Sequence, residues 1–116
     1  QHFDAAHFLR GYQGKCEALH GHRFRVVAEI NASEVDDIGL AYDFMVLKQH
    51  LADIITRFDH TCLNDISPFD SINPSSENIA ATICQELLPK LEEDPVSISS
   101  IAVWESPQSR IVYTPD

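Results

Sequence analysis

The residues of this chain best suited to chemistry are three histidines and a cysteine that fall close together, His7, Cys16, His20 and His22. The histidines are flanked by sequence typical of β-strands, in which side chains two positions apart point to the same face. His20 and His22 therefore share a face. Imidazole is the commonest zinc ligand, and catalytic zinc sites keep three protein ligands and one open position. The cysteine would then be free for proton transfer, so the pattern indicates an enzyme.

Each of these residues also has a simpler interpretation. A histidine on an apolar strand face is more often a buried core residue with satisfied hydrogen bonds, and a single cysteine is more often inert. Two observations support a metal site beside that interpretation, and both interpretations stay open at this point. A third histidine lies nearby in the sequence, and Gly21 lets another group approach the backbone closely.

Length, charge and cysteine content limit the class of protein. The chain is long enough for one domain, spanning residues 1–116, with one modest core. Its net charge of −10 argues against binding to nucleic acid or to an anionic membrane. No apolar stretch approaches the roughly 18 residues of a membrane span. An odd number of cysteines without a disulfide framework favours a reducing, cytoplasmic setting.

The charge is unevenly distributed along the chain. Residues 1–25 carry four cations and two acidic residues, so the histidine region is basic within an acidic protein. An anionic small substrate would be attracted to such a region, although scattered cations can also be simply solvated. The cations to be considered for such a role are Arg10, Lys15, Arg23 and Lys48.

The strands that must position the histidines follow from alternation of apolar side chains. Residues 20–30 alternate clearly and predict a strand with two of the histidines at its entrance. A first strand is expected to end at His7. Residues 96–105 and 110–114 predict a closing β-hairpin around a turn that contains Pro107.

Helical spacing of apolar residues predicts two helices. The first begins after the N-cap Asp43 and runs through Phe58. The second begins near Ser75 or Ser76, and Pro89 is expected to kink or end it.

The resulting order ββααββ predicts an α+β fold. It should be a four-stranded antiparallel sheet with both helices on one face. The long connection over residues 59–74, without secondary structure of its own, is of a kind that is often functional. The other face of the sheet would be partly exposed in a monomer, so we expect a homo-oligomer.

The chain resembles the 6-pyruvoyltetrahydropterin synthase family, whose bacterial branch includes the 6-carboxytetrahydropterin synthases of the queuosine pathway. Five ordered matches over nearly the whole chain are more specific than any one of them. They are Phe3-Asp-Ala-Ala-His7 with Cys16-Glu-Ala-Leu-His20-Gly-His22, then Asp43-Phe44-x-x-Leu47-Lys48, Phe58-Asp59-His60-x-x-Leu63-Asn64-Asp65, Asn73-Pro74-x-Ser76-Glu77-Asn78-Ile79-Ala80, and Val103-Trp104-Glu105. The resemblance implies the tunnelling fold, in which sheets of several subunits join into a barrel, in a trimer-based assembly expected to be a hexamer.

The resemblance also assigns the metal and its ligands. The family is zinc-dependent, and His7, His20 and His22 match its Zn²⁺ ligands. In the family, zinc chelates the side-chain oxygens of the substrate and acidifies the adjacent C–H.

The remaining site residues take their roles from the same resemblance. Cys16 matches the base that removes the substrate proton, and Lys15 beside it favours the thiolate. Asp59 would orient His60, which exchanges protons, and in the family this pair comes from a neighbouring subunit. Glu105 matches the carboxylate that anchors the pterin ring. Without the resemblance, Asp59 and His60 would be taken for a helix C-terminal cap, and Glu105 for the end of a strand.

Glu17 leaves the chemistry open. One branch of the family uses a glutamate as its base in the pattern Glu-x-x-His-Gly-His, which residues 17–22 also satisfy. The simpler interpretation is a solvated loop carboxylate, with Cys16 as the base. Side-chain cleavage to 6-hydroxymethyl-dihydropterin would follow if Glu17 were the base.

The expected function is that of a zinc-dependent lyase acting on a small molecule, 7,8-dihydroneopterin triphosphate. The expected product is 6-carboxy-5,6,7,8-tetrahydropterin, for deazapurine biosynthesis. The first alternative is 6-pyruvoyltetrahydropterin formation at the same site. A non-catalytic zinc-binding module is the alternative of another class, and Cys16, Asp59, His60 and Glu105 speak against it because metal storage needs none of them.

Overall fold

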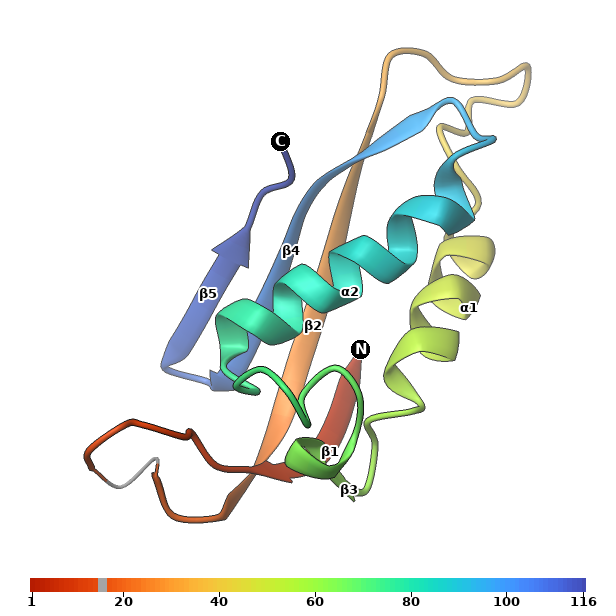
Figure 1. Ribbon diagram of the computed structural model, residues 1–116. Coiled ribbons are helices and arrows are strands. Elements are labelled where there is room, and N and C mark those ends of the chain that lie inside the picture. The colour runs from red at the N-terminus through yellow and green to blue at the C-terminus, as the bar shows by residue number, and fades with distance from the viewer. Residues whose placement is uncertain (15–16) are drawn as a thin grey trace.

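The computed structural model describes residues 1–14 and 17–116, which form one five-stranded sheet with two helices (Figure 1). The strands lie in the order β3-β1-β2-β4-β5. Their bounds are His2–His7 for β1, His20–Ala32 for β2, Thr61–Cys62 for β3, Val96–Ser106 for β4 and Ser109–Tyr113 for β5. Neighbouring strands are antiparallel except β1 and β3, which are parallel.

Both helices, α1 (Phe44–Ile55) and α2 (Ser76–Leu91), cover the same face of the sheet (Figure 1). The predicted α+β architecture with a helix-free sheet face is therefore confirmed. The core fills the space between the helices and the sheet. Its largest fully buried side chains include Phe3, Phe24, Val26, Phe58, Ile79, Ile83, Leu87, Ile101 and Val103. Burial of each such side chain contributes about 1.5–3 kcal/mol to folding.

Side-chain caps fix the starts of both helices. The Asp43 carboxylate accepts a hydrogen bond from the Met45 N–H at 2.8 Å, and the Ser75 hydroxyl accepts one from the Asn78 N–H at 3.2 Å. These bonds satisfy amide groups that the first helical turn leaves without partners. The predicted cap Asp43 is confirmed. The second helix begins at Ser76, within the predicted position, and Ser75 caps it.

Helix α1 ends at Ile55, earlier than the sequence predicted. The chain then turns, and His60 adopts a left-handed conformation with φ of 59°. After this turn the chain enters β3, where Thr61 and Cys62 pair with Ala5 and Ala6 of β1. A four-stranded sheet was expected, and this fifth strand is the correction. It was missed because two residues are too short to show an alternating pattern.

The connection expected to lack secondary structure contains β3 and a 3₁₀ turn at Leu63–Asp65. The expectation that Pro89 kinks or ends the second helix is also only partly met, because α2 continues to Leu91 with Pro89 in its last turn. Pro89 removes an amide that would bond to the Gln85 carbonyl, and both residues are exposed, so water can solvate that carbonyl. Among the described helices, none is long and apolar enough to cross a membrane.

Candidate functional site

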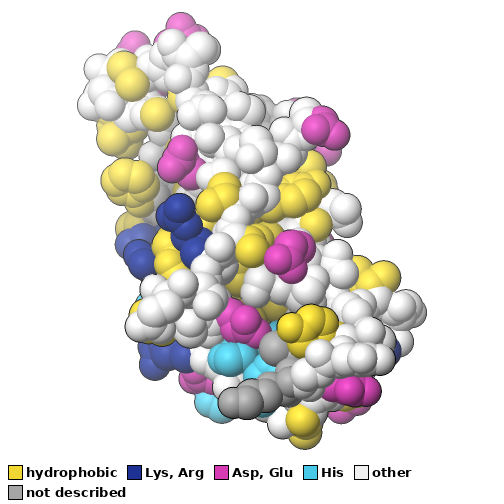
Figure 2. All heavy atoms as spheres, turned by 90° about the vertical axis from the view of Figure 1, so that its left-hand side faces the viewer, with side chains coloured by type: hydrophobic (Ala, Val, Ile, Leu, Met, Phe, Trp, Pro, Cys, Tyr) yellow, Lys and Arg dark blue, Asp and Glu magenta, His cyan; other side chains and the backbone are white. Residues whose placement is uncertain are grey.

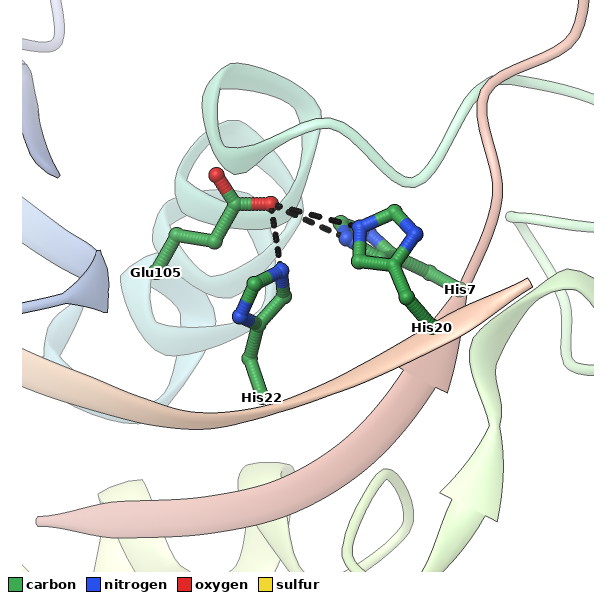
Figure 3. Close-up of side chains that lie close together, drawn as sticks. All are labelled: His7, His20, His22 and Glu105. Atoms are coloured by element: carbon green, nitrogen blue, oxygen red, sulfur yellow. Dashed lines mark hydrogen bonds and ion pairs between the residues drawn. The ribbon is translucent and has the colours of Figure 1, made fainter. Parts of the chain in front are cut away.

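Strand register brings the three histidines together on the helix-bearing face of the sheet. In the antiparallel β1–β2 pair, His7 lies opposite His20 and Ala5 lies opposite His22. Side chains directly opposite and two apart on one face are neighbours. Glu105, near the end of β4, reaches the same place from the other side of β2 (Figure 3). Three strands therefore contribute the four side chains of this cluster.

The side chains of the cluster point at one another (Figure 3). Glu105 Oε1 lies 3.0 Å from His7 Nε2, 3.1 Å from His22 Nε2 and 4.0 Å from His20 Nε2. One candidate ligand atom from each residue lies within 4.8 Å of all the others. Three imidazole nitrogens and a carboxylate oxygen at such separations suit a first-row divalent metal ion.

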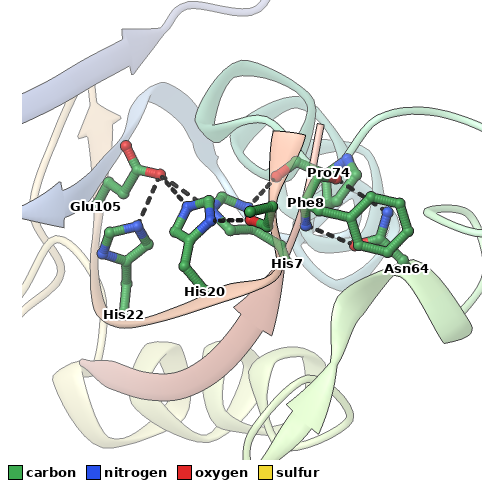
Figure 4. A network of polar contacts seen from close by, with 8 residues as sticks. His7, Phe8, His20, His22, Asn64, Pro74 and Glu105 are labelled. Carbon is green, nitrogen blue, oxygen red and sulfur yellow. Dashed lines mark hydrogen bonds and ion pairs between the residues drawn. The ribbon is translucent and has the colours of Figure 1, made fainter. Parts of the chain in front are cut away.

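Two of the imidazole rings are oriented by backbone carbonyls (Figure 4). His7 Nδ1 lies 2.7 Å from the Pro74 carbonyl oxygen, and His20 Nδ1 lies 2.7 Å from the Ala18 carbonyl oxygen. A carbonyl only accepts, so each Nδ1 carries the hydrogen and each Nε2 keeps its lone pair for the cluster. This outer arrangement is typical of metal-bound histidines.

The third ring, His22, is held differently. Its Nε2 is buried and has no hydrogen-bond partner within the described part of the chain, and Glu105 Oε1 lies 3.1 Å from it. Burial lowers the pKa of His22, and this effect outweighs the carboxylate of Glu105, which raises it. A neutral, buried nitrogen that no described residue hydrogen-bonds therefore faces the cluster. A bound metal ion would satisfy it, so the residues fit the group that the sequence predicted.

Two asparagines fix the chain directly after His7. Asn64 accepts from the Phe8 N–H and donates to the Phe8 carbonyl, both at 3.0 Å. Asn73 does the same with Arg10, at 2.8 and 2.9 Å. Both asparagines belong to sequence motifs named above, but nothing in their spacing indicated this double pairing. They hold the 63–74 connection, and with it the Pro74 carbonyl, against β1.

The guanidinium of Arg10 also bonds to this connection. It donates to the carbonyls of Phe69 at 2.9 Å and Ile72 at 3.2 Å. Arg10 was one of the cations considered for recognition of an anionic substrate. Its contacts give it a structural role in the loop that carries Pro74, and a role in anion binding stays a prediction.

Asp59 and His60 form a second group on the edge of the sheet. The backbone N–H of Asp4 donates to Asp59 Oδ1 at 2.8 Å, and His60 Nδ1 lies 2.9 Å from Asp59 Oδ2. These contacts, first that from Asp4 and then that from His60, hold the pKa of Asp59 below its usual value. The carboxylate thus contacts the His60 ring, and its role in orienting a catalytic histidine stays a prediction. Within this one chain, the pair and the three histidines form separate groups.

A cavity of about 400 Å³ opens beside the histidine cluster. His7 and Glu105 line one side of it, and Ser76 and Glu77 from the start of α2 line another. The sequence had marked Ser76 as a helix start and both residues as family matches, so their contribution to a cavity was missed. A larger hollow of about 560 Å³ lies around Ser33 and Asp94, away from the histidines. Of these two cavities, the one beside the histidines is lined by candidate metal-ligating side chains.

Cys16 and Glu17 are the two candidates for the catalytic base, and the structure describes one of them. Cys16 lies outside the described residues. Glu17 is described, and it is an exposed residue whose N–H donates to the Gly14 carbonyl at 3.2 Å.

The sheet, its one-sided helices and the cluster at the strand ends together define an α+β protein of the tunnelling-fold class. The family model described as 6-pyruvoyl tetrahydropterin synthase matches residues 1–116. The chain therefore belongs to the 6-pyruvoyl tetrahydropterin synthase family, a family of lyases, and the resemblance noted in the sequence is confirmed.

Curated relatives and solved structures agree with this placement. The chain is 36% identical to the 6-carboxy-5,6,7,8-tetrahydropterin synthase of Bacillus subtilis, over 98% of this chain and 81% of that protein. It is 39% identical to the protein of the same description from Synechocystis, over 96% and 86% of the two chains. The structure of Caenorhabditis elegans 6-pyruvoyl tetrahydropterin synthase superimposes with a TM-score of 0.87 at 26% identity, covering 100% of this chain and 91% of that one.

Proposed function

We propose that this protein is a zinc-dependent synthase that converts 7,8-dihydroneopterin triphosphate to 6-carboxy-5,6,7,8-tetrahydropterin. The observation that carries the proposal is the convergence of three histidine Nε2 atoms beside a cavity of substrate size. The choice of product is supported by the relatives described as 6-carboxy-5,6,7,8-tetrahydropterin synthases. Such a product would serve deazapurine biosynthesis of the queuosine type.

His7, His20 and His22 would hold Zn²⁺ through their Nε2 atoms. Bound there, zinc would act as a Lewis acid toward oxygen atoms of the substrate side chain. The protein supplies the orientation: carbonyls fix the rings of His7 and His20, and packing fixes His22.

Proton transfer belongs to residues outside the histidine cluster. We assign Cys16 as the thiolate that removes a proton from the substrate side chain, on the basis of the family motif. His60 exchanges protons through the ring nitrogen that does not face Asp59. The Asp59 carboxylate accepts the other ring hydrogen and stabilises the imidazolium form.

Glu105 is proposed to bind the pterin ring. Its carboxylate lines the cavity and presents two acceptor oxygens, which match adjacent ring N–H and amino donors. One of these oxygens also faces the three histidines, so the same side chain lies between the cavity and the metal ligands. The distances from Glu105 Oε1 to the three histidine Nε2 atoms would also allow Glu105 to be a fourth metal ligand. Zinc content of Glu105→Gln separates the two roles, since an anchor can be changed without loss of zinc.

The active form is proposed to be a homo-oligomer built from trimers, with a hexamer expected. The separation of Asp59 and His60 from the histidines within one chain supports this, because a neighbouring subunit would complete the site. Large apolar side chains that remain exposed also support it, including Ile38, Phe44 and Met45.

One alternative product deserves a test of its own. The family description and the Caenorhabditis elegans structure both name 6-pyruvoyl tetrahydropterin synthase, and that reaction would use the same residues. Cleavage of the side chain with Glu17 as base is the other chemical alternative. A zinc-binding module without catalysis is the alternative of another class.

One experiment tests the proposal. The purified protein is incubated with 7,8-dihydroneopterin triphosphate, its zinc content is measured, and the products are identified by mass spectrometry. The proposal predicts 6-carboxy-5,6,7,8-tetrahydropterin and about one zinc per chain. A pyruvoyl or hydroxymethyl product would select one of the alternative reactions, and no turnover by a zinc-loaded oligomer would favour the binding module.

A further inference from the structure

A row of cations crosses the helix-free face of the sheet. The strand registers place His2 opposite Arg25, Arg25 opposite Trp104, and Trp104 opposite Arg110. The row thus runs from β1 through β2 and β4 to β5. It lies on the face away from the helices, because these residues alternate with buried ones such as Phe3, Phe24 and Val103 along their strands. We refer to His2, Arg23, Arg25, Trp104 and Arg110 as the cationic row.

Two arginines of the row share one aromatic ring. Arg25 Cζ lies 4.6 Å from the centroid of the Trp104 ring, and Arg110 Cζ lies 5.3 Å from it. Each contact is favourable, but together they hold two positive charges near one indole. Like charges held close together repel, so an anion between them would be stabilised.

The arginines of the row have no acidic partner among the described residues. The arginine that does form an ion pair with a carboxylate is Arg57, whose Nη1 lies 2.7 Å from Glu86 Oε1. Asp4 lies opposite Arg23 in the register but forms no ion pair with it in the described part of the chain. In a chain of net charge −10, uncompensated cations gathered on one face are unexpected.

The pKa of His2, at the end of the cationic row, is lowered from its ordinary value. Desolvation lowers it most, and the positive charges of Arg23 and Arg25 lower it further. Asp4 acts in the opposite direction and does not reverse the shift.

The row borders a hollow of about 330 Å³, lined by His2, Arg23, Arg25, Trp104, Ser106 and Pro107. Figure 2 shows Lys and Arg side chains gathered at one side of this view, near the histidines. The hollow and the cavity beside the histidine cluster lie around the same β4–β5 hairpin. Arg110 lines that cavity and also stacks on Trp104, so it connects the two.

We propose that the cationic row binds the oligophosphate group of a small molecule. Guanidinium groups present several N–H donors in a planar fork that matches phosphate oxygens, and they keep their charge at every physiological pH. Arg23 and Arg25 line the hollow, and Arg110 lies against Trp104 beside it. Three guanidiniums in this arrangement suit two or three linked phosphates better than a single carboxylate. The indole holds the arginine side chains in place, which reduces the entropy lost on binding.

Two sources of this group are compatible with the site. One is the triphosphate tail of the substrate, reaching around the hairpin from the cavity, and this assignment rests on the proposed function. The other is a free oligophosphate that acts as an effector. Both share the chemistry that the row would recognise, so the first measurement uses inorganic triphosphate and needs no turnover.

Binding of inorganic triphosphate is measured by isothermal titration calorimetry at low and at physiological ionic strength. Saturable binding by the wild type is expected, and each of Arg25→Gln and Arg110→Gln should weaken it by about tenfold. Glutamine keeps part of the side-chain stem over Trp104, and circular dichroism and zinc content check the fold. Lys90→Gln, which removes the same charge from exposed α2, is the matched control and should bind as the wild type does.

Absence of saturable binding by the wild type would overturn the proposal. Equal weakening by Lys90→Gln would also overturn it, because it would show net charge rather than a site. Steady-state kinetics then identify the source: a raised KM for the triphosphate substrate with kcat retained in Arg25→Gln assigns the row to the substrate tail. An unchanged KM together with lost triphosphate binding assigns it to a free oligophosphate. Failure of the proposed reaction itself leaves the calorimetric result intact.

Discussion

His22 differs from the other two candidate ligands in what holds its ring. Carbonyl oxygens orient His7 and His20, whereas His22 packs edge-on against Phe24, with ring centroids 5.6 Å apart, and against His7. Its buried Nε2 has no hydrogen bond in the described structure. A group left in that condition costs about 1–3 kcal/mol, which a metal ligand bond would offset. The donor atoms of the histidine cluster therefore fit a metal ion.

We expect His20→Ala and His22→Ala each to abolish stoichiometric zinc while leaving most of the fold intact. Two imidazoles do not form the three-ligand set that a catalytic zinc site requires. Metal analysis of the purified variants measures the loss, and circular dichroism checks the fold. His50→Ala, on α1 outside the cluster, should retain about one zinc per chain. Unchanged zinc affinity in either cluster variant would show that the ligand assignment is wrong.

The catalytic base is a choice between two adjacent residues. Cys16→Ala should lower the synthase rate by roughly 10²–10⁴-fold, the usual contribution of a general base, and should spare zinc because the histidines supply the ligands. Glu17 is exposed, and Glu17→Ala should change the rate by less than about tenfold. Rates and product profiles of both variants at confirmed zinc content test this. If Glu17→Ala were inactive and Cys16→Ala fully active, the protein would belong with the glutamate-dependent cleavage branch.

At the scale of secondary structure, periodic patterns predicted the elements and local hydrogen bonds decided their details. The alternation over β2 and the cap Asp43 are short-range signals, and both were read correctly from the sequence. Strand β3, the left-handed His60 and the double pairing of Asn64 depend on contacts across more than 50 residues. Such contacts leave no local pattern, so the sequence could name these residues only through motifs.

Some residues of the candidate site could likewise be predicted from a local pattern, and others depend on long-range contacts. Its three histidines could be named because a strand places alternate residues on one face. The approach of Glu105 to them depends on the register between β2 and β4, which includes an irregularity at Glu29–Ile30. No spacing within one strand reveals a register between two, and the cationic row was missed for the same reason.

One long-range contact between elements has a measurable pH signature. The Tyr42 hydroxyl, just before α1, donates to Asp94 Oδ2 at 2.8 Å, in the turn between α2 and β4. Desolvation first, and then the bond to Asp94, raises the pKa of Tyr42 to about 12 from 10.0. Because the folded-state pKa lies above the unfolded one, this stabilisation is complete below pH 10 and is lost as the pH rises toward 12.

Tyr42→Phe should therefore lower the free energy of unfolding by about 1 kcal/mol at neutral pH, the usual net value of such a bond. The difference from the wild type should shrink as the pH rises through the interval above 10. Urea unfolding across this range measures both effects. Tyr113→Phe, on β5, serves as a control for loss of a hydroxyl elsewhere. A wild-type advantage that grew with pH would contradict the assignment.

At the scale of the whole molecule, exposed apolar surface and a divided site both predict assembly. Ile38, Phe44 and Met45 are 78–79% exposed, and Phe44 and Met45 begin α1. Exposed apolar side chains grouped in this way mark interaction surfaces.

Sedimentation velocity of the wild type should show a trimer-based oligomer, expected to be a hexamer. Phe44→Glu with Met45→Glu should shift it toward smaller species, whereas Lys90→Glu should not. A fully active monomer at micromolar concentration would exclude required assembly.

A site shared between neighbouring subunits makes a sharper prediction, because two inactive variants should recover activity when they assemble together. If Cys16 and the pair of Asp59 and His60 act from neighbouring subunits, Cys16→Ala and His60→Ala chains complement in mixed oligomers. Random mixing in equal amounts places an intact cysteine beside an intact His60 in about a quarter of the sites. Activity should thus rise from near background to about a quarter of the wild-type rate after the subunits are dissociated and reassembled together.

The control for this experiment mixes the same two variants without dissociation, so that no subunits exchange and no activity returns. A second control reassembles Cys16→Ala with His22→Ala. In this mixture too, each variant carries the residue that the other lacks. If Cys16 and His22 of one site lie in the same chain, no mixed site is complete and no activity returns. Returned activity would mean that these two residues lie in different subunits as well. Failure of Cys16→Ala and His60→Ala to complement after verified exchange would place the cysteine and the Asp59–His60 pair of one site in a single chain. The exposed position of His60, 78% accessible on the sheet edge, would then need another explanation.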